Sequence, residues 1–132
     1  MLDSTNNKSA EDFNPLQHAL EICNGSSIRF EGRMPVNYKI GWADLVKEML
    51  MEIKDTGALL TCISSDYGLL DVQFESCKKI YELKVWRAIN VARLNSKRTC
   101  TDCGDLGYRH FREDSVVVLC RGCVDKFSGG GR

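Results

Sequence analysis

The chain has 132 residues, of which 18 are Lys or Arg, 18 are Asp or Glu and 7 are Cys, so its formal net charge is zero. This length is typical of one compact domain with a small appended module and excludes a multidomain machine. An apolar share of 43% and a charged share of 27% exclude wholesale disorder. No apolar run approaches the roughly 20 residues that a membrane span needs, and the polar N-terminus lacks the apolar core of a signal peptide. We therefore expect a cytoplasmic protein without a membrane partner, in a compartment where disulfides are rare.

The net charge of zero conceals an uneven distribution. Residues 1–75 hold 6 basic and 12 acidic side chains, whereas residues 76–132 hold 12 basic and 6 acidic ones. Two interpretations stay open: the two halves attract each other and pack together, or the C-terminal half binds a polyanion.

A polar arm and a short helix are predicted at the start of the chain. Residues 1–14 are mostly polar and predict a flexible N-terminal arm. Residues 15–23 predict a helix, because proline is favoured in a first helical turn. Leu16, Leu20 and Cys23 are expected to share its apolar face.

The clearest helix of the chain follows a short strand at residues 28–30 and an extended connector at residues 33–41. It is predicted to begin near Trp42, and Gly57 is a suitable stop. Its apolar side chains recur with a helical period, at Leu45, Val46, Met49, Leu50 and Ile53.

Residues 58–74 predict a β-hairpin. The segments ALLTCIS and LLDVQF read as strands, and Leu70, Val72 and Phe74 alternate on one face of the second. Asp66-Tyr67-Gly68 predicts the turn between them, with an exposed tip.

A second long helix is predicted over Ser76–Leu94, with Ser76 as its N-cap. One apolar stripe runs along it, formed by Cys77, Tyr81, Val85, Ala88, Ile89 and Ala92. Trp42 and Trp86 are expected to be core anchors. Two helices and a hairpin thus predict a small α+β body over residues 15–97.

Cysteine spacing carries the chemistry of this sequence. Cys100-x-x-Cys103 is followed, after 16 residues, by Cys120-x-x-Cys123. Two such pairs predict a four-cysteine zinc site, because each pair can grip one metal ion from a tight turn. Four thiolates leave no open coordination position, so we expect one structural zinc ion per chain. An iron–sulfur cluster and a redox-active CxxC are the weaker alternatives.

The cysteine pairs enclose a predicted hairpin. The segments LGYRHF and SVVVL read as strands joined by Arg112-Glu113-Asp114. Gly104 and Gly122 are expected to provide left-handed backbone at the two cysteine turns. A helix at residues 124–127 would make the module treble-clef-like, and its absence would make it a zinc ribbon. The module is assigned to residues 98–127, followed by a flexible tail at 128–132.

The remaining cysteines and the histidines predict no catalysis. Cys23, Cys62 and Cys77 lack pair spacing and are expected to be small buried apolar side chains. His110 is interpreted as a surface or supporting histidine rather than a metal ligand, because the cysteine set is already complete. A cysteine nucleophile would need a neighbouring histidine, and the chain has only 2. We therefore expect no enzyme.

Basic residues surround the predicted zinc module and are candidates for contact with nucleic acid or an acidic partner. Tyr108, Phe111 and Phe127 lie among them; these aromatic rings could stack on bases or, alternatively, form a small core around the metal. The candidate basic residues are Arg93, Lys97, Arg98, Arg109, Arg112, Arg121 and Lys126.

The segment from Gly41-Trp42 through Cys123 resembles a group of small uncharacterised proteins found in bacteria and phages. The resemblance rests on a Gly-Trp helix start (GWADLVKEML), an aromatic-Gly-Leu hairpin (DYGLLDVQF) and the cysteine knuckles RTCTDCG and LCRGC. Members of the group usually carry basic residues before the aromatic-Gly, where this chain has Ser64-Ser65-Asp66. The resemblance implies the fold and no particular activity.

Two functions are therefore predicted. The first is a non-enzymatic, zinc-stabilised protein that binds another protein, such as a phage- or mobile-element-borne inhibitor of a host defence system. The second is a zinc-ribbon regulator that binds nucleic acid through its basic C-terminal half.

Overall fold

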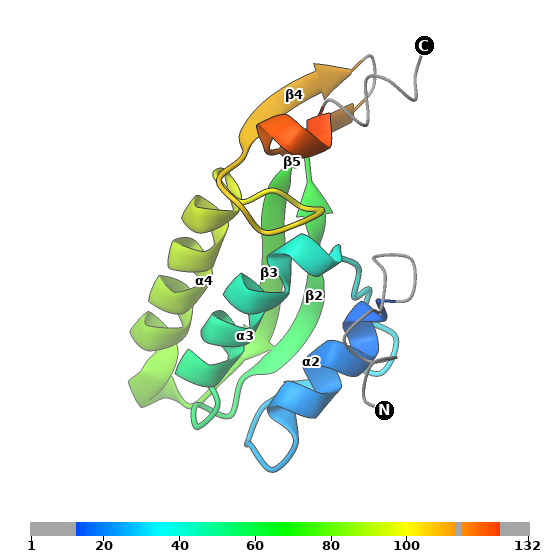
Figure 1. The fold of residues 1–132 in the computed structure, drawn as a ribbon. Coiled ribbons are helices and arrows are strands. Elements are labelled where there is room, and N and C mark those ends of the chain that lie inside the picture. The colour runs from blue at the N-terminus through cyan, green and yellow to red at the C-terminus, as the bar shows by residue number, and fades with distance from the viewer. Residues whose placement is uncertain (1–12, 113–114, 125–132) are drawn as a thin grey trace.

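A computed structural model of the chain describes residues 13–112 and 115–124. It is a mixed α+β fold, which confirms the predicted class. Three α-helices lie side by side over one face of a three-stranded sheet, and a separate two-stranded hairpin lies beyond one end of that sheet (Figure 1). Among the described residues, no helix is long and apolar enough to cross a membrane.

The first helix, α2 (Pro15–Cys23), is capped by Asn14, whose side chain accepts a hydrogen bond of 3.0 Å from the backbone N–H of Gln17. Its predicted apolar face is wrong. Ala19 is buried together with Cys23, whereas Leu16 and Leu20 are 44% and 49% exposed. The small Ala19 side chain allows α2 to approach its neighbour closely, which turns the leucines outward.

The second helix follows a single 3₁₀ turn. This turn, η2 (Ile40–Trp42), leads into α3 (Ala43–Glu52), close to the predicted start. Gly57 does not end the helix itself, but its φ of +70° ends the irregular turn that follows it. The predicted apolar stripe is confirmed, because all of its members are buried: Leu45, Val46, Met49, Leu50 and Ile53.

The predicted hairpin is confirmed as β2 (Leu59–Asp66) and β3 (Leu69–Ser76), which pair antiparallel. Tyr67 and Gly68 form its two-residue turn with φ of +52° and +80°, values that a type I′ turn requires. The predicted short strand is β1 (Arg29–Phe30), and it pairs in parallel with β2 to complete the sheet in the order β1-β2-β3.

The third helix begins later than predicted. Ser76 pairs with Leu59 at the end of β3, so it is not an N-cap. A 3₁₀ turn, η3 (Lys79–Tyr81), precedes α4 (Glu82–Ser96). The predicted stripe holds within the helix, where Val85, Ala88, Ile89 and Ala92 are buried.

Trp86 on α4 is not the core anchor that the sequence predicts. Its side chain is 49% exposed and lies against Phe74 of β3, with ring centroids 4.9 Å apart. Trp42, in contrast, is 1% exposed and belongs to the single core that the three helices and β2–β3 share. The two tryptophans therefore differ because only Trp42 lies between layers.

The C-terminal hairpin consists of β4 (Tyr108–Arg112) and β5 (Ser115–Leu119), as predicted. Residues 121–124 are helical, so a helical turn begins three residues before the helix that the treble-clef-like interpretation expects at residues 124–127. Residues 125–127 of that expected helix, residues 1–12 of the arm predicted at 1–14, and the tail at 128–132 lie outside the described residues.

Candidate metal centre

Four cysteine thiols converge beside the C-terminal hairpin. The Sγ atoms of Cys100, Cys103, Cys120 and Cys123 all lie within 4.8 Å of one another, and all four are free thiols. The Sγ atoms of Cys103 and Cys120 are 3.5 Å apart. A tetrahedral ion with metal–sulfur bonds of about 2.3 Å places its sulfur atoms about 3.8 Å apart. The four predicted ligands therefore lie where one metal ion can be held.

The first cysteine pair sits in a turn closed by the backbone. The N–H of Cys100 donates to the carbonyl of Asp105 at 2.8 Å, and the carbonyl of Cys100 accepts from the N–H of Gly104 at 2.9 Å. Gly104 has a φ of +86°, so the predicted left-handed position is confirmed. A side chain at this residue would be strained, which explains why glycine follows Cys103.

The second pair lies at the start of a helical turn. The carbonyl of Cys120 accepts a hydrogen bond of 2.9 Å from Val124, and the N–H of Cys123 points at Cys120 Sγ at 3.4 Å. The prediction of a left-handed Gly122 is wrong, because its φ is not positive. The residues between these two cysteines are helical, so ordinary right-handed backbone brings the two thiols together.

Hydrogen bonds and burial shift the pKa values of three of the four thiols. The backbone N–H of Cys123 and the neighbouring thiol of Cys103 lower the pKa of Cys120 to about 7. A backbone hydrogen bond from Asp105 lowers the pKa of Cys103, but burial and hydrogen bonds with Cys120 and Cys100 outweigh it and raise that pKa to about 11. Burial, followed by hydrogen bonds with the other thiols, raises the pKa of Cys123. The lowered pKa of Cys120 favours its thiolate, which is the form in which a cysteine can bind a metal ion.

The turn of Cys100 and Cys103 is joined to the body through the start of α3. The indole N–H of Trp42 donates to the carbonyl of Thr99 at 2.9 Å, and the N–H of Gly41 donates to the carbonyl of Thr101 at 2.7 Å. Gly41 packs so closely that a Cβ there would overlap the backbone of Cys100 and Thr101. The first cysteine turn is thus held against the body by hydrogen bonds and close packing at Gly41 and Trp42.

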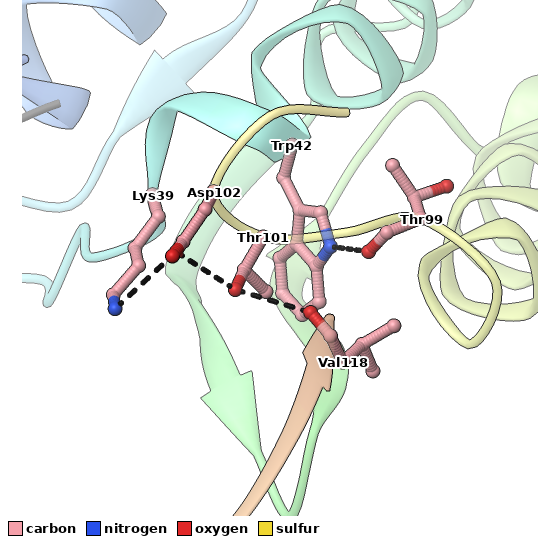
Figure 2. Close-up of polar contacts among 6 residues, drawn as sticks. All are labelled: Lys39, Trp42, Thr99, Thr101, Asp102 and Val118. Atoms are coloured by element: carbon pink, nitrogen blue, oxygen red, sulfur yellow. Dashed lines mark hydrogen bonds and ion pairs between the residues drawn. The ribbon is translucent and has the colours of Figure 1, made fainter. Parts of the chain in front are cut away.

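A second set of contacts joins this turn to the hairpin. Figure 2 shows Thr101 beside the carbonyl of Val118. This carbonyl accepts two hydrogen bonds from Thr101, one from the backbone N–H at 2.9 Å and one from the hydroxyl at 3.2 Å. Asp102 forms an ion pair of 3.6 Å with Lys39, which precedes η2. The sequence contains the Gly-Trp signal, but nothing in its spacing predicts these contacts between distant segments.

His110 lies outside the cysteine cluster. Its Nε2 is 3.3 Å from the carbonyl oxygen of Leu119, and it is not among the groups that could share a metal ion within the described residues. This placement agrees with its interpretation as a supporting residue: it links β4 to the end of β5, directly before Cys120.

The three remaining cysteines differ in burial. Cys23 and Cys62 are buried as predicted, and burial raises the pKa of Cys23 to about 11. The prediction is wrong for Cys77, which is only partly buried. Cys77 lies between β3 and η3 rather than on the inner face of a helix, and it packs against the edge of the core.

The candidate basic residues belong to different elements. Arg93 lies on α4 and Lys97 and Arg98 directly follow it, whereas Arg109 lies on β4 and Arg121 in the helical turn after Cys120. All five are exposed. The side chain of Arg112, on β4, and the whole of Lys126 lie outside the described structure.

The excess of positive charge belongs to α4 and not to the metal module. Residues 78–98 hold seven basic side chains and one acidic side chain, whereas residues 99–132 hold five of each. The excess of basic side chains in the C-terminal half therefore lies on α4 and the residues that flank it.

An exposed aromatic patch lies beside the metal module, formed by Tyr67, Arg109 and Phe111. Tyr67 and Phe111 are 70% and 71% exposed. The guanidinium of Arg109 donates to the carbonyl of Tyr67 at 3.5 Å, and its carbon lies 5.3 Å from the ring centroid of Phe111. The sequence predicts an exposed Tyr67 but not its proximity to β4.

The chain matches no model of a protein family, no curated protein and no solved structure. Its function therefore has to be inferred from the geometry of its own residues.

Proposed function

We propose that the chain is a non-enzymatic protein that binds another protein and that one structural zinc ion stabilises its C-terminal hairpin. Four converging cysteines support zinc, because an all-sulfur tetrahedral set suits this ion and leaves no position for water or substrate. Sulfur atoms within 4.8 Å of one another are close enough to bind a single ion and closer than the wider cage of an iron–sulfur cluster needs, which supports zinc.

The two histidines support a role without catalysis. Nδ1 of His18 lies 2.6 Å from the hydroxyl of Tyr38, and His110 contacts the carbonyl of Leu119. Neither is hydrogen-bonded to a thiol, so neither is placed as the base of a cysteine nucleophile.

The aromatic patch carries the proposal of a protein partner. Tyr67 has a φ of +52°, a conformation that costs a tyrosine on the order of 1 kcal/mol, and yet its ring is 70% exposed. Tyrosine and arginine dominate the binding energy of protein interfaces, and phenylalanine is enriched there. An exposed aromatic ring on a disfavoured turn residue therefore indicates a contact outside the chain.

A pull-down with two single variants and a matched control tests this role. Tyr67→Ser and Phe111→Ser remove the patch, whereas Tyr108→Ser removes a ring that is 60% exposed on the opposite side of β4. We expect mass spectrometry to identify a host protein that the wild type and Tyr108→Ser retain and both patch variants lose. Retention of the same proteins by all four chains, or of none by the wild type, would refute the proposal.

We further propose, from the predicted resemblance to small bacterial and phage proteins, that the protein partner belongs to a host defence system and that the chain inhibits it. In a bacterial host that carries such a system, the expressed chain is then expected to restore phage growth, and Tyr67→Ser to abolish the effect. Equal restoration of phage growth by the wild type and Tyr67→Ser would show that inhibition does not require the patch. If the chain restores phage growth in no defended host, the proposed inhibition is refuted.

Nucleic-acid binding is the second candidate function, and the charge of residues 78–98 favours it. Binding through Arg93, Lys97 and Arg98 should weaken steeply as salt rises, because phosphate contacts release counterions. Replacing all three by Ser should abolish binding of a labelled DNA or RNA, whereas Arg109→Ser and Arg121→Ser should leave it unchanged. A wild-type chain that binds neither nucleic acid at low salt contradicts this candidate.

A further inference from the structure

A shallow groove runs between α3 and α4 on the side of the molecule away from the sheet. It has a volume of about 280 Å³. Its floor is apolar and comes from Leu45, Met49, Ala88 and Ala92. On α4 its lining extends from residue 84 to residue 95, a length of about 16 Å at a rise of 1.5 Å per residue.

The two walls of this groove carry opposite charges. Glu48 and Glu52 line the α3 wall, and Lys84 and Arg87 line the α4 wall. All four are exposed, and among the residues that the structure describes no ion pair joins the walls. The groove therefore presents two separated, unneutralised rows of charge on either side of an apolar floor.

We propose that this groove is the interface of a two-fold dimer, with a second copy of the chain as its occupant. A two-fold axis that runs along the groove places α3 of each copy over α4 of the other. Because α3 and α4 run antiparallel, as the contact of Trp42 with Thr99 shows, Glu52 then faces Lys84 of the other copy and Glu48 faces Arg87. The four helices form a bundle across the axis.

Exposed apolar side chains extend the interface beyond the groove. On the outward surface of α3, Met51 is 45% exposed, and on that of α4, Leu83 and Leu94 are 77% and 59% exposed. In the dimer, Met51 lies near Leu83 of the other copy. A phosphate backbone or an anionic lipid surface would neutralise the basic wall, but its negative charge would repel the acidic wall. A second copy satisfies both walls at once.

The overall charge of the chain also favours self-association. Its formal net charge is zero, so no net repulsion keeps copies apart. The inference does not depend on the metal ion or on the aromatic patch, so it can fail or hold independently of the proposed function.

Sedimentation equilibrium of the full chain with charge-reversal variants tests the dimer. The wild type is expected to have the mass of a dimer at micromolar concentrations. Glu48→Lys with Glu52→Lys, and separately Lys84→Glu with Arg87→Glu, should each raise the dissociation constant by a factor of about 100 or more, because like charges then meet at four contacts. Mixing the two double variants should restore a dimer, since each wall then faces its opposite.

Arg29→Glu combined with Arg33→Glu is the matched control. Both residues are exposed, lie on neither α3 nor α4 and do not line the groove, so this variant should remain as dimeric as the wild type. A wild type that stays monomeric up to millimolar concentration overturns the proposal, and so do double variants that remain dimers. A monomer that binds vesicles of anionic lipid, or a different protein, through this groove would assign the surface to another occupant and likewise overturn it.

Discussion

At Gly41 the backbone of the body touches the backbone of the turn that carries Cys100 and Cys103. Its N–H donates to Thr101, and the space for a side chain is already filled by the backbone of Cys100 and Thr101. A methyl group at this residue could be accommodated only if the cysteine turn moved away from η2.

Gly41→Ala is therefore expected to lower the free energy of unfolding by about 1–3 kcal/mol and to weaken metal retention. Gly32→Ala is the control, because a Cβ at Gly32 meets nothing within 4 Å and its φ is ordinary. Urea unfolding and metal transfer to a coloured chelator measure the two effects. Equal behaviour of the two variants would show that the contact at Gly41 does not hold the cysteine turn.

His18 couples the stability of α2 to pH. Its ring lies among Phe13 and Tyr38, and burial lowers its pKa below 6.5, against the opposing charges of Asp44 and Glu21. A lowered pKa means that the unfolded chain binds the proton more tightly. The stabilisation by neutral His18 is thus complete above pH 6.5 and is lost as the pH falls below that value.

We expect the free energy of unfolding of the wild type to fall between pH 7 and pH 5 more steeply than that of His18→Gln. Comparison of the two chains isolates this residue from every other effect of acid that both chains share. The measurement is urea unfolding at several pH values in one buffer of constant ionic strength. Parallel curves for the two chains would contradict the assigned protonation state.

At the level of single residues, the sequence predicts correctly where the spacing of side chains is set by the geometry of a shared ligand. The intervals of Cys100, Cys103, Cys120 and Cys123 predict convergence because two tight turns can share one ion. The same reasoning failed at Gly122, since a glycine can also occupy a helical turn. Burial of a side chain outside a periodic stripe, such as Trp86 or Cys77, depends on which element covers it, and the local sequence does not indicate that element.

At the scale of elements, Ser96 joins the end of α4 to the hairpin of the sheet. It is fully buried, and its hydroxyl accepts from the N–H of Leu70 at 2.9 Å and donates to the carbonyl of Arg93 at 2.6 Å. Leu70 lies at the start of β3, so this hydroxyl fixes the helix end against the strand. No side-chain nitrogen or oxygen of the described residues is buried without a hydrogen-bond partner.

Ser96→Ala should lower the free energy of unfolding by about 1–3 kcal/mol, because it leaves the buried N–H of Leu70 without its acceptor. Ser76→Ala provides the control. If Ser76 capped the helix, its loss would also cost about 1 kcal/mol, but as an exposed strand residue it should change stability by less than about 0.5 kcal/mol. Chemical denaturation of both variants decides between these assignments, and similar losses would contradict the observed start of α4.

The elements with strong local signals were predictable. The periodic stripe of α3 and the alternation and turn of β2–β3 are encoded within windows of a few residues. The pairing of β1 with β2 joins Arg29 to Leu59, and a parallel contact across that distance leaves no local pattern. The outward leucines of α2 were mispredicted for a related reason, since the close approach of α3 selects the smaller Ala19.

At the scale of the whole molecule, the positive charge and the cysteine cluster of the C-terminal half belong to two different parts of the structure. The positive excess lies on α4 and its flanks, whereas the cysteine module is electrically balanced. The sequence analysis predicts a basic C-terminal half and a cysteine module, but it does not predict that they are separate. A charge count over residues 76–132 combines basic α4 with the electrically balanced module. Contacts through Gly41, Trp42 and Lys39 then join the module to the body.

The most direct test is the metal content of the purified full chain, measured together with its stability. We expect one zinc ion per chain by elemental analysis, and the absorption of a tetrahedral thiolate site after cobalt substitution. Cys100→Ser and Cys120→Ser should lose the metal and cease to fold, whereas Cys62→Ser should retain the metal. A metal-free wild type that melts at the same temperature with and without zinc would contradict the account.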